Sequence, residues 1–475
     1  MGNLRNIAKA LLGALFVICV YRAFTQSVVF DEALTWELYI AGPVDKIFHS
    51  FEANHHFLNT VLMRLVTAVL GVSAWSMRIP ALAGAALYFT AVYRIARTAF
   101  GEGWTFLLAV AALSLNPFVL DFMVAARGYG MALALWMWAL AVLLQVFDSN
   151  DAQPGMLIQA GSALALSVTA NMVLVLPAAA LAGMTVYFLA KLPKPVASKK
   201  AKRADVKKGV SPILAFLGPI VGIAVVFLLL APVEDMKLDQ FYTGVASIPE
   251  SLRSMATVSL AYAGPLAGSR LASWRDVVAF GIAPLALAAG LAWGVVRRNW
   301  LLLLAAGPAV FSGVALLLIH FVLGRPYPAD RTGLYFLPLV MLTLLGLTLV
   351  RVKAATVVAW AFTLLFVAQF LTEFNVKKFW VWDYDADTRT MGEYIASHRG
   401  SGNVRVGGSW QLSESLGFYL FQNRWDWMEI NRRAPQPGDD FYALIPQDQS
   451  AVQKLGLKEV FRGRVSGSIL AVPAK

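Results

Sequence analysis

The sequence predicts an α-helical membrane protein with many spans that ends in a small α/β domain. Hydrophobic residues make up 58% of the 475 residues and charged residues only 14%, against about 25% charged residues in an ordinary soluble protein. The apolar residues form long blocks, and about 20 apolar residues suffice to cross a bilayer as a helix. The alternating pattern of a membrane β-barrel is absent. We therefore expect helices, which pair all of their own backbone polar groups inside lipid.

About eleven blocks have the composition of a membrane span. The first follows Arg5 and Lys9 and resembles a signal peptide, but it lacks a clear cleavage site, so we expect it to remain as an uncleaved span. We interpret the block 57–70 as a helix at the membrane surface. The expected spans lie near 6–24, 76–97, 104–120, 126–147, 156–170, 171–190, 211–231, 277–296, 300–320, 333–350 and 354–372.

Basic clusters indicate how these spans are oriented, because cytoplasmic loops are enriched in Lys and Arg. With a cytoplasmic N-terminus and eleven spans, the clusters fall on the cytoplasmic side, and only Arg22 is an exception. The strongest cluster is lysine-rich and could also bind anionic membrane lipids. The clusters are Arg94 with Arg97, Arg297 with Arg298, Arg351 with Lys353, and the run from Lys191 to Lys208.

This orientation predicts two domains in the plasma (inner) membrane of the cell. Residues 1–372 form a transmembrane domain with a first outer loop at 25–75, and residues 373–475 form an extracytoplasmic α/β domain. The net charge of +12 is explained by the cytoplasmic loops, so we expect no nucleic acid partner. Within the tail we expect helices at 388–398, 413–422 and 450–455, and strands at 403–406, at 441–445 and near the end.

Two adjacent carboxylates, Asp31 and Glu32, follow the first span at the start of the outer loop. Buried carboxylates are costly at a membrane boundary unless they are paired. Such a group can act as a general base or hold a cation, or it can be a solvated loop acid. We expect the later acids of the loop, Glu37, Asp45 and Glu52, to lie at the surface.

Two histidines, His55 and His56, lie in the same loop. Adjacent side chains on a helix point about 100° apart, so joint metal ligation would need a loop conformation. Hydrogen bonds from the imidazoles to a phosphate are the favoured interpretation. Packing at a helix start is the structural alternative.

Arginines and tyrosines recur at the other outer boundaries. Arg127 precedes Gly128 and Tyr129 where a span begins, and the segment 324–335 carries Arg325, Arg331 and Tyr335. Arginine matches the oxygens of a phosphate with its planar fork. An interfacial belt of aromatic and basic residues would explain each cluster singly, but it explains less well why acids, histidines and arginines reach one face.

No glycine-rich phosphate loop, HExxH, GxSxG or CxxC motif occurs. The motifs that do occur resemble, in their order, glycosyltransferases of the C superfamily, in particular protein O-mannosyltransferases and the aminoarabinose transferases that modify lipid A. The resemblance covers about residues 5–372. It depends on Phe30-Asp31-Glu32, Asn54-His55-His56, Met77-Arg78-Ile79-Pro80-Ala81-Leu82, Ala126-Arg127-Gly128-Tyr129, and Arg331 with Tyr335 and Pro338.

The resemblance implies a sugar transfer from a polyprenyl-phosphate donor to a lipid, glycan or protein acceptor at the outer membrane face. Asp31 would be the base, with Glu32 as its rival. The substrate-binding residues would be His55, His56, Arg127, Tyr129, Arg325, Arg331 and Tyr335. No cofactor is certain, and the sequence leaves a divalent metal ion open.

Two other functions remain open at the level of sequence. A transporter or flippase of a lipid-linked sugar would place polar groups near the membrane midplane, often in repeated halves, whereas here they gather at one face and no repeat is seen. A non-catalytic assembly protein with an outer interaction domain is the second alternative. Movement of a labelled lipid-linked sugar without a glycosylated product would favour the flippase.

Overall fold

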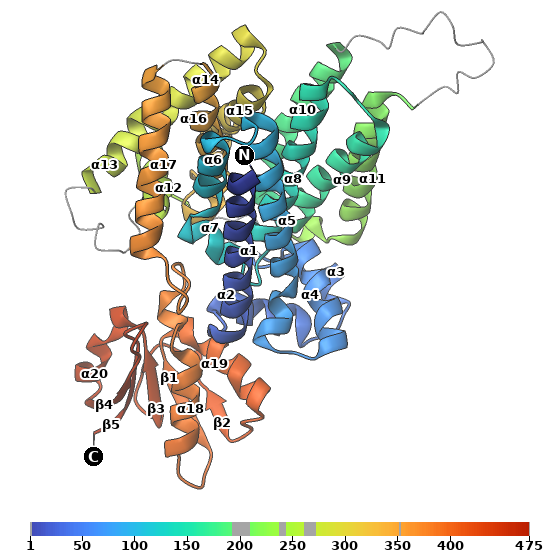
Figure 1. Cartoon of the computed structure of the whole chain (residues 1–475). Coiled ribbons are helices and arrows are strands. Elements are labelled where there is room, and N and C mark those ends of the chain that lie inside the picture. The colour runs from blue at the N-terminus through green and yellow to red at the C-terminus, as the bar shows by residue number, and fades with distance from the viewer. Residues whose placement is uncertain (1, 192–209, 237–243, 261–271, 351–352, 475) are drawn as a thin grey trace, which may run out of the picture. The chain divides into compact units, whose positions relative to one another are not determined.

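The computed structural model describes residues 2–191, 210–236, 244–260, 272–350 and 353–474. Most of the lysine-rich run, from residue 192 onward, and Arg351 lie outside the described residues. Eight helices within the described parts are long and apolar enough to cross a membrane. They contain α1 (Gly2–Thr25), α5 (Ala74–Phe100), α8 (Gly128–Ser149), α10 (Val175–Lys191), α11 (Pro212–Leu230), α14 (Ala283–Arg297), α15 (Trp300–Leu323) and α17 (Lys353–Glu373) (Figure 1).

These eight helices confirm a multi-pass membrane protein. Three further expected spans are apolar helices too short to meet the same length criterion: α6 (Trp104–Ser114), α9 (Pro154–Ala170) and α16 (Phe336–Gly346). Their membrane crossing stays a prediction. The block that we interpreted as a surface helix is α4 (Phe57–Leu70), and the remaining short helices are α2 (Phe30–Thr35), α3 (Lys46–His49), α7 (Pro117–Phe122), α12 (Ile248–Leu260) and α13 (Ala272–Val277).

The chain forms two compact units. The first contains residues 1–16, 83–120 and 128–374, and the second contains residues 17–82, 121–127 and 375–475. In the first unit α5 can approach α8 closely because Gly84 has no Cβ. A Cβ at this position would lie 2.9 Å from the Cα of Met131. The second unit groups the C-terminal tail with the first loop.

The tail contains a five-stranded sheet with the order β2-β1-β3-β5-β4, in which β2, β1 and β3 are parallel and β5 and β4 are antiparallel. Helices α18 and α19 cover one face of the sheet, and α20 covers the other. The bounds are β1 Val404–Gly408, β2 Met428–Ile430, β3 Phe441–Leu444, β4 Leu457–Arg462, β5 Ile469–Pro473, α18 Thr388–His398, α19 Trp410–Asn423 and α20 Ser450–Lys454. The small α/β domain predicted from the sequence is confirmed.

A buried ion pair explains the exception to the charge rule in the first span. Arg22 lies near the end of α1 with its side chain only 1% exposed, and its Nη2 is 2.5 Å from Oδ1 of Asp121. The other carboxylate oxygen of Asp121 accepts the N–H of Trp380 at 2.7 Å. Arg22 is therefore fixed by a partner inside the protein, and it does not report on the orientation of the span.

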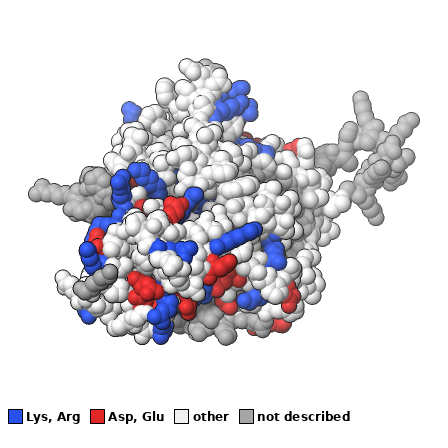
Figure 2. Space-filling view, turned by 90° about the horizontal axis from the view of Figure 1, so that it is seen from below, with Lys and Arg blue, Asp and Glu red and all other residues white. Residues whose placement is uncertain are grey.

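Charges of both signs lie next to one another on the face shown in Figure 2. Within the second unit, Arg432 pairs with Glu37 at 2.7 Å and with Glu414 at 2.9 Å, and Arg462 pairs with Glu459 at 2.5 Å. These local pairs place charges of opposite sign next to one another within the second unit.

Candidate active site

Asp31 and Arg127, both predicted to lie at the outer membrane face, are side by side in the second unit. Asp31 is the second residue of α2, and its Oδ2 is 3.6 Å from Nη2 of Arg127. Both side chains are buried, with 9% and 2% of their surfaces exposed. Arg127 also donates from Nη1 to Oγ1 of Thr35 at 3.2 Å. A carboxylate and a guanidinium that were predicted to share one face of the membrane are thus adjacent.

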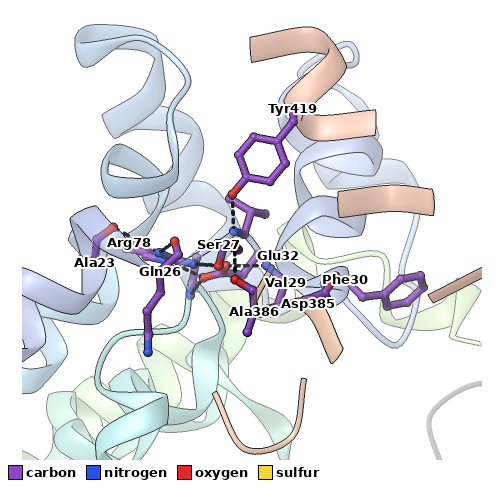
Figure 3. Close-up of polar contacts among 12 residues, drawn as sticks. Ala23, Gln26, Ser27, Val29, Phe30, Glu32, Arg78, Asp385, Ala386 and Tyr419 are labelled. Carbon is purple, nitrogen blue, oxygen red and sulfur yellow. Dashed lines mark hydrogen bonds and ion pairs between the residues drawn. The ribbon is translucent and has the colours of Figure 1, made fainter. Parts of the chain in front are cut away.

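Glu32 has a different environment, because its carboxylate is occupied by hydrogen bonds. Nε of Arg78 donates to Oε1 at 2.9 Å and Nη2 donates to Oε2 at 2.6 Å. The backbone N–H groups of Ala126 and Val29 donate to the same two oxygens, at 2.6 Å and 3.1 Å. The remaining N–H groups of Arg78 bind the carbonyls of Ala23, Gln26 and Ser27 (Figure 3).

This arrangement gives Glu32 a positioning role. Four donors occupy its two oxygens, and its side chain is completely buried with that of Arg78. The pair ties the start of α2 to α5 and to the segment before Arg127. Arg78 was part of a sequence motif but was not among the predicted site residues.

Residues of the tail contact the turn immediately before Asp31. Asp385 accepts the N–H of Phe30 on Oδ2 at 2.7 Å, and Tyr419 accepts the N–H of Val28 on its hydroxyl at 2.8 Å. The hydroxyl of Ser27 donates to the carbonyl of Ala386 at 2.9 Å. Figure 3 shows these contacts around the first loop. Nothing in the sequence singled out Asp385 or Tyr419.

The two histidines precede α4, and both are buried. The ring of His55 stacks on that of Tyr39 with centroids 4.4 Å apart, and Phe51 and Phe57 lie at 5.1 Å and 5.7 Å. Burial lowers the pKa of His55 to about 4, which a hydrogen bond to the Ser50 backbone only partly opposes. His55 is therefore a neutral ring at pH 7, an environment that fits the packing alternative. Phosphate contacts of His55 and His56 stay predictions.

The other predicted binding residues belong to the first unit. Tyr129 is the second residue of α8 and is buried. Arg331 lies in a 3-10 turn, Asp330–Gly333, and Tyr335 is buried with its ring stacked on Phe336 at 4.5 Å. Arg325 lies at the start of the same segment. The association of these four residues with Asp31 stays a prediction.

A cavity of about 910 Å³ lies among helices α12, α14, α15, α16 and α17 of the first unit. Its lining is almost entirely apolar. Tyr327 and Pro328 belong to the lining, and they connect the cavity to the segment that carries Arg325 and Arg331. The volume and apolar lining of this cavity are suited to a long apolar chain.

A divalent metal ion is neither supported nor excluded by the residues that the structure describes. In that part of the chain no three His, Cys, Asp or Glu side chains come together as ligands for a metal ion. The oxygens of Glu32 are moreover occupied by Arg78 and by two backbone N–H groups. We therefore derive no chemical step through a metal.

A sequence family matches one part of the chain. Residues 54–204 match the family described as dolichyl-phosphate-mannose-protein mannosyltransferase. This match confirms the resemblance that the sequence motifs indicated. No curated protein sequence matches the chain.

Several solved structures are similar to the chain at low sequence identity. ArnT from Cupriavidus metallidurans, bound to undecaprenyl phosphate, has 14% identity over 97% of both chains and a TM-score of 0.43. The Archaeoglobus fulgidus oligosaccharyltransferase, in complex with zinc and sulfate, has 14% identity over 97% of this chain and 72% of that chain, and a TM-score of 0.41. The arabinofuranosyltransferase AftD from Mycobacteria has 15% identity over 99% of this chain but 40% of its own, and a TM-score of 0.44.

Proposed function

We propose that this chain is a membrane glycosyltransferase. It transfers a sugar from a polyprenyl-phosphate donor to a lipid, glycan or protein acceptor at the extracytoplasmic face. The family match supports the donor class, since dolichyl phosphate is a polyprenyl phosphate. The observation that carries the proposal is the buried pair of Asp31 and Arg127, 3.6 Å apart at the start of the first loop.

Asp31 is the base in the proposed transfer. An oxygen of the acceptor forms a bond to the anomeric carbon of the sugar, while the bond from that carbon to the phosphate oxygen breaks. The electrons of the breaking bond remain on the lipid phosphate, and the proton of the acceptor passes to the Asp31 carboxylate. General-base assistance of this kind contributes roughly 100-fold to 10,000-fold to a rate.

Arginine stabilises the charge that develops on the departing phosphate. Arg127 is held beside Asp31, and its guanidinium carries its charge at any physiological pH. A fixed donor at the place where charge develops needs no reorganisation during the reaction, and losing one costs about 100-fold to 1000-fold in rate. Arg325 and Arg331 of the first unit are proposed as further phosphate-binding residues.

The apolar cavity is proposed to hold the polyprenyl chain of the donor. Its lining has the character of the chain, and its volume of about 910 Å³ lies near the upper end of small-molecule pockets. Tyr327 and Pro328 line the cavity and lie in the segment that also carries Arg331. Arg331 is therefore proposed to bind the phosphate of a chain held in the cavity.

The test compares purified wild type with Asp31→Asn, which is nearly isosteric. The assay measures release of polyprenyl phosphate and transfer of labelled sugar from synthetic polyprenyl-phosphate mannose and its pentose counterpart to a membrane extract. We expect a rate loss of at least about 100-fold, the lower end for general-base catalysis, with donor binding retained. Asp45→Asn changes an exposed acid of the same loop and should retain wild-type turnover.

Wild-type turnover in Asp31→Asn would remove Asp31 from the role of base. Movement of the labelled donor across vesicles without any glycosylated product, by wild type itself, would replace the transferase with a flippase.

A further inference from the structure

The N-cap residue of the helix that carries Asp31 has no side-chain acceptor. Helix α2 is six residues long and is preceded by Val29, whose side chain cannot accept a hydrogen bond. The first N–H groups of any helix lack partners within the helix, and Ser, Thr, Asp or Asn usually supplies the missing acceptor. Helix α2 continues without a break into a π-helical turn, Trp36–Ile40, and the two together are still shorter than the roughly 12–15 residues that an isolated helix needs in water. Its position must therefore be fixed from outside.

Two acceptors for the start of this helix and the residue before its N-cap come from the far end of the chain. Oδ2 of Asp385 accepts the N–H of Phe30, and the hydroxyl of Tyr419 accepts the N–H of Val28. These contacts join residues that are 355 and 391 positions apart in the sequence. The third N–H of this turn, that of Val29, is bound by Glu32. The tail thus binds the first N–H of α2, that of Phe30, and the N–H of the residue before the N-cap, Val28.

We propose that Asp385 and Tyr419 are positioning residues for Asp31, so that the C-terminal domain forms part of the catalytic apparatus. The inference rests on the proposed function, in which Asp31 is the base. Phe30 is the direct neighbour of Asp31, so a shift of its backbone moves the carboxylate as well. A misplacement of about 1 Å can cost about 100-fold in rate.

The chemistry of Asp385 suits this role. Its side chain is completely buried, and burial raises its pKa to about 8, although the Phe30 N–H and neighbouring hydroxyls oppose the shift. The nearby charge of Asp31 acts in the same direction as burial. At neutral pH Asp385 is therefore mostly an uncharged acid, which caps Phe30 without adding a second negative charge beside the base. Asparagine has the same shape and is uncharged.

A neighbouring acid provides a matched control. Asp387 is also buried, and its Oδ2 accepts three hydrogen bonds, from the N–H groups of Val465 and Ser466 and from the Ser466 hydroxyl. All of these partners lie within the tail. Asp387→Ala therefore weakens the tail without removing a contact to the first loop.

The experiment uses full-length protein in detergent and synthetic polyprenyl-phosphate mannose, or its pentose counterpart if wild type prefers that donor. For Asp385→Ala we expect kcat to fall about 10-fold to 100-fold while KM for the donor changes by less than about 3-fold. Asp385→Asn should retain at least about a third of wild-type kcat, because its amide oxygen still accepts the Phe30 N–H. Tyr419→Phe, which loses one hydroxyl, should lose about 3-fold to 10-fold in kcat.

Hydrogen exchange gives a second reading that does not depend on activity. The amides of Val28 and Phe30 should exchange faster in Asp385→Ala and Tyr419→Phe, and at the wild-type rate in Asp387→Ala. If Asp385→Ala fails to fold, Tyr419→Phe and Asp385→Asn still test the proposal.

Two outcomes would overturn this inference. One is a wild-type kcat in both Asp385→Ala and Tyr419→Phe. The other is an equal loss of kcat in Asp387→Ala, which would reduce the effect to tail stability. A wild type that transfers no sugar from any donor would instead count against the proposed function, and the exchange data would still report whether the tail fixes the turn.

Discussion

Arg78 binds both carboxylate oxygens of Glu32 through Nε and Nη2, at 2.9 Å and 2.6 Å, with neither side chain exposed to solvent. Arg78 also donates to three backbone carbonyls, and Glu32 also accepts from two backbone N–H groups. We call this set of hydrogen bonds the Arg78–Glu32 fork. Of the two adjacent acids after the first span, Glu32 thus holds the loop together. Asp31, which pairs with Arg127, is the acid to which we assign the proposed chemistry.

Glu32→Gln should therefore act through stability. The substitution removes the negative partner of a buried arginine, and breaking such a pair costs about 3–5 kcal/mol. We expect a clear fall in the midpoint of thermal unfolding, measured in detergent by tryptophan fluorescence. Glu37→Gln is the control, because Glu37 pairs with a half-exposed Arg432 and should cost only about 0–1 kcal/mol. An unchanged midpoint in Glu32→Gln would contradict the structural role of the fork.

Filling the apolar cavity should change the preference for donor chain length. Gly313 lines the cavity, and a Cβ at this position meets no atom within 4 Å, so Gly313→Leu adds a side chain without a clash at its base. We expect affinity for a long-chain polyprenyl-phosphate sugar to fall about 3-fold to 10-fold, and affinity for a two-isoprene analogue to stay the same. Gly222→Leu in α11 is equally open but outside the lining. Equal affinities in all three proteins would place the chain elsewhere.

Protein stability should depend on pH through Asp385. Its folded-state pKa of about 8 exceeds the ordinary value of about 3.9, so the folded protein binds a proton that the unfolded chain releases. The contribution of this bound proton to the free energy of unfolding is complete below pH 4. It is lost progressively as the pH rises from there through 8. Between pH 5 and 8.5 the unfolding midpoint should fall more in wild type than in Asp385→Asn. If the unfolding midpoints of the two proteins changed equally with pH, burial would not raise the pKa of Asp385.

Cysteine labelling tests the orientation that the basic clusters predict. Ser401→Cys and Asp151→Cys place thiols at exposed positions, in the tail and in the loop between α8 and α9. The native Cys19 is buried and should give little background. An impermeant thiol reagent should label position 401 in spheroplasts and position 151 only after lysis. The reverse pattern would move the proposed site to the cytoplasmic face.

Much of the fold could be predicted because its signals are local. The expected helix 388–398 coincides with α18, and the strand 441–445 with β3. The strand β2 was missed, since three residues, Met428–Ile430, are too few to show an alternating pattern. The length of the membrane blocks likewise indicated the long helices directly.

The site was less predictable because its partners are distant in sequence. The order of the motifs predicted Asp31 and Arg127 on one face of the membrane, and in the structure the two side chains are adjacent. The sequence could not show two buried contacts: the carboxylate of Glu32 is bound by Arg78, and the ring of His55 packs among aromatic rings. Asp385 lies in a short acidic stretch that resembles any surface turn, and only its contact with Phe30 shows otherwise.

The caps of α2 also set an order in time during biosynthesis. Phe30 leaves the ribosome 355 residues before Asp385, and at about 5–20 residues per second the interval is on the order of 20–70 s. During this interval the newly inserted first loop lacks two of its hydrogen bond acceptors. A chain that stalls before residue 385 therefore has neither tail acceptor to fix the turn before Asp31, the residue that we propose as the base.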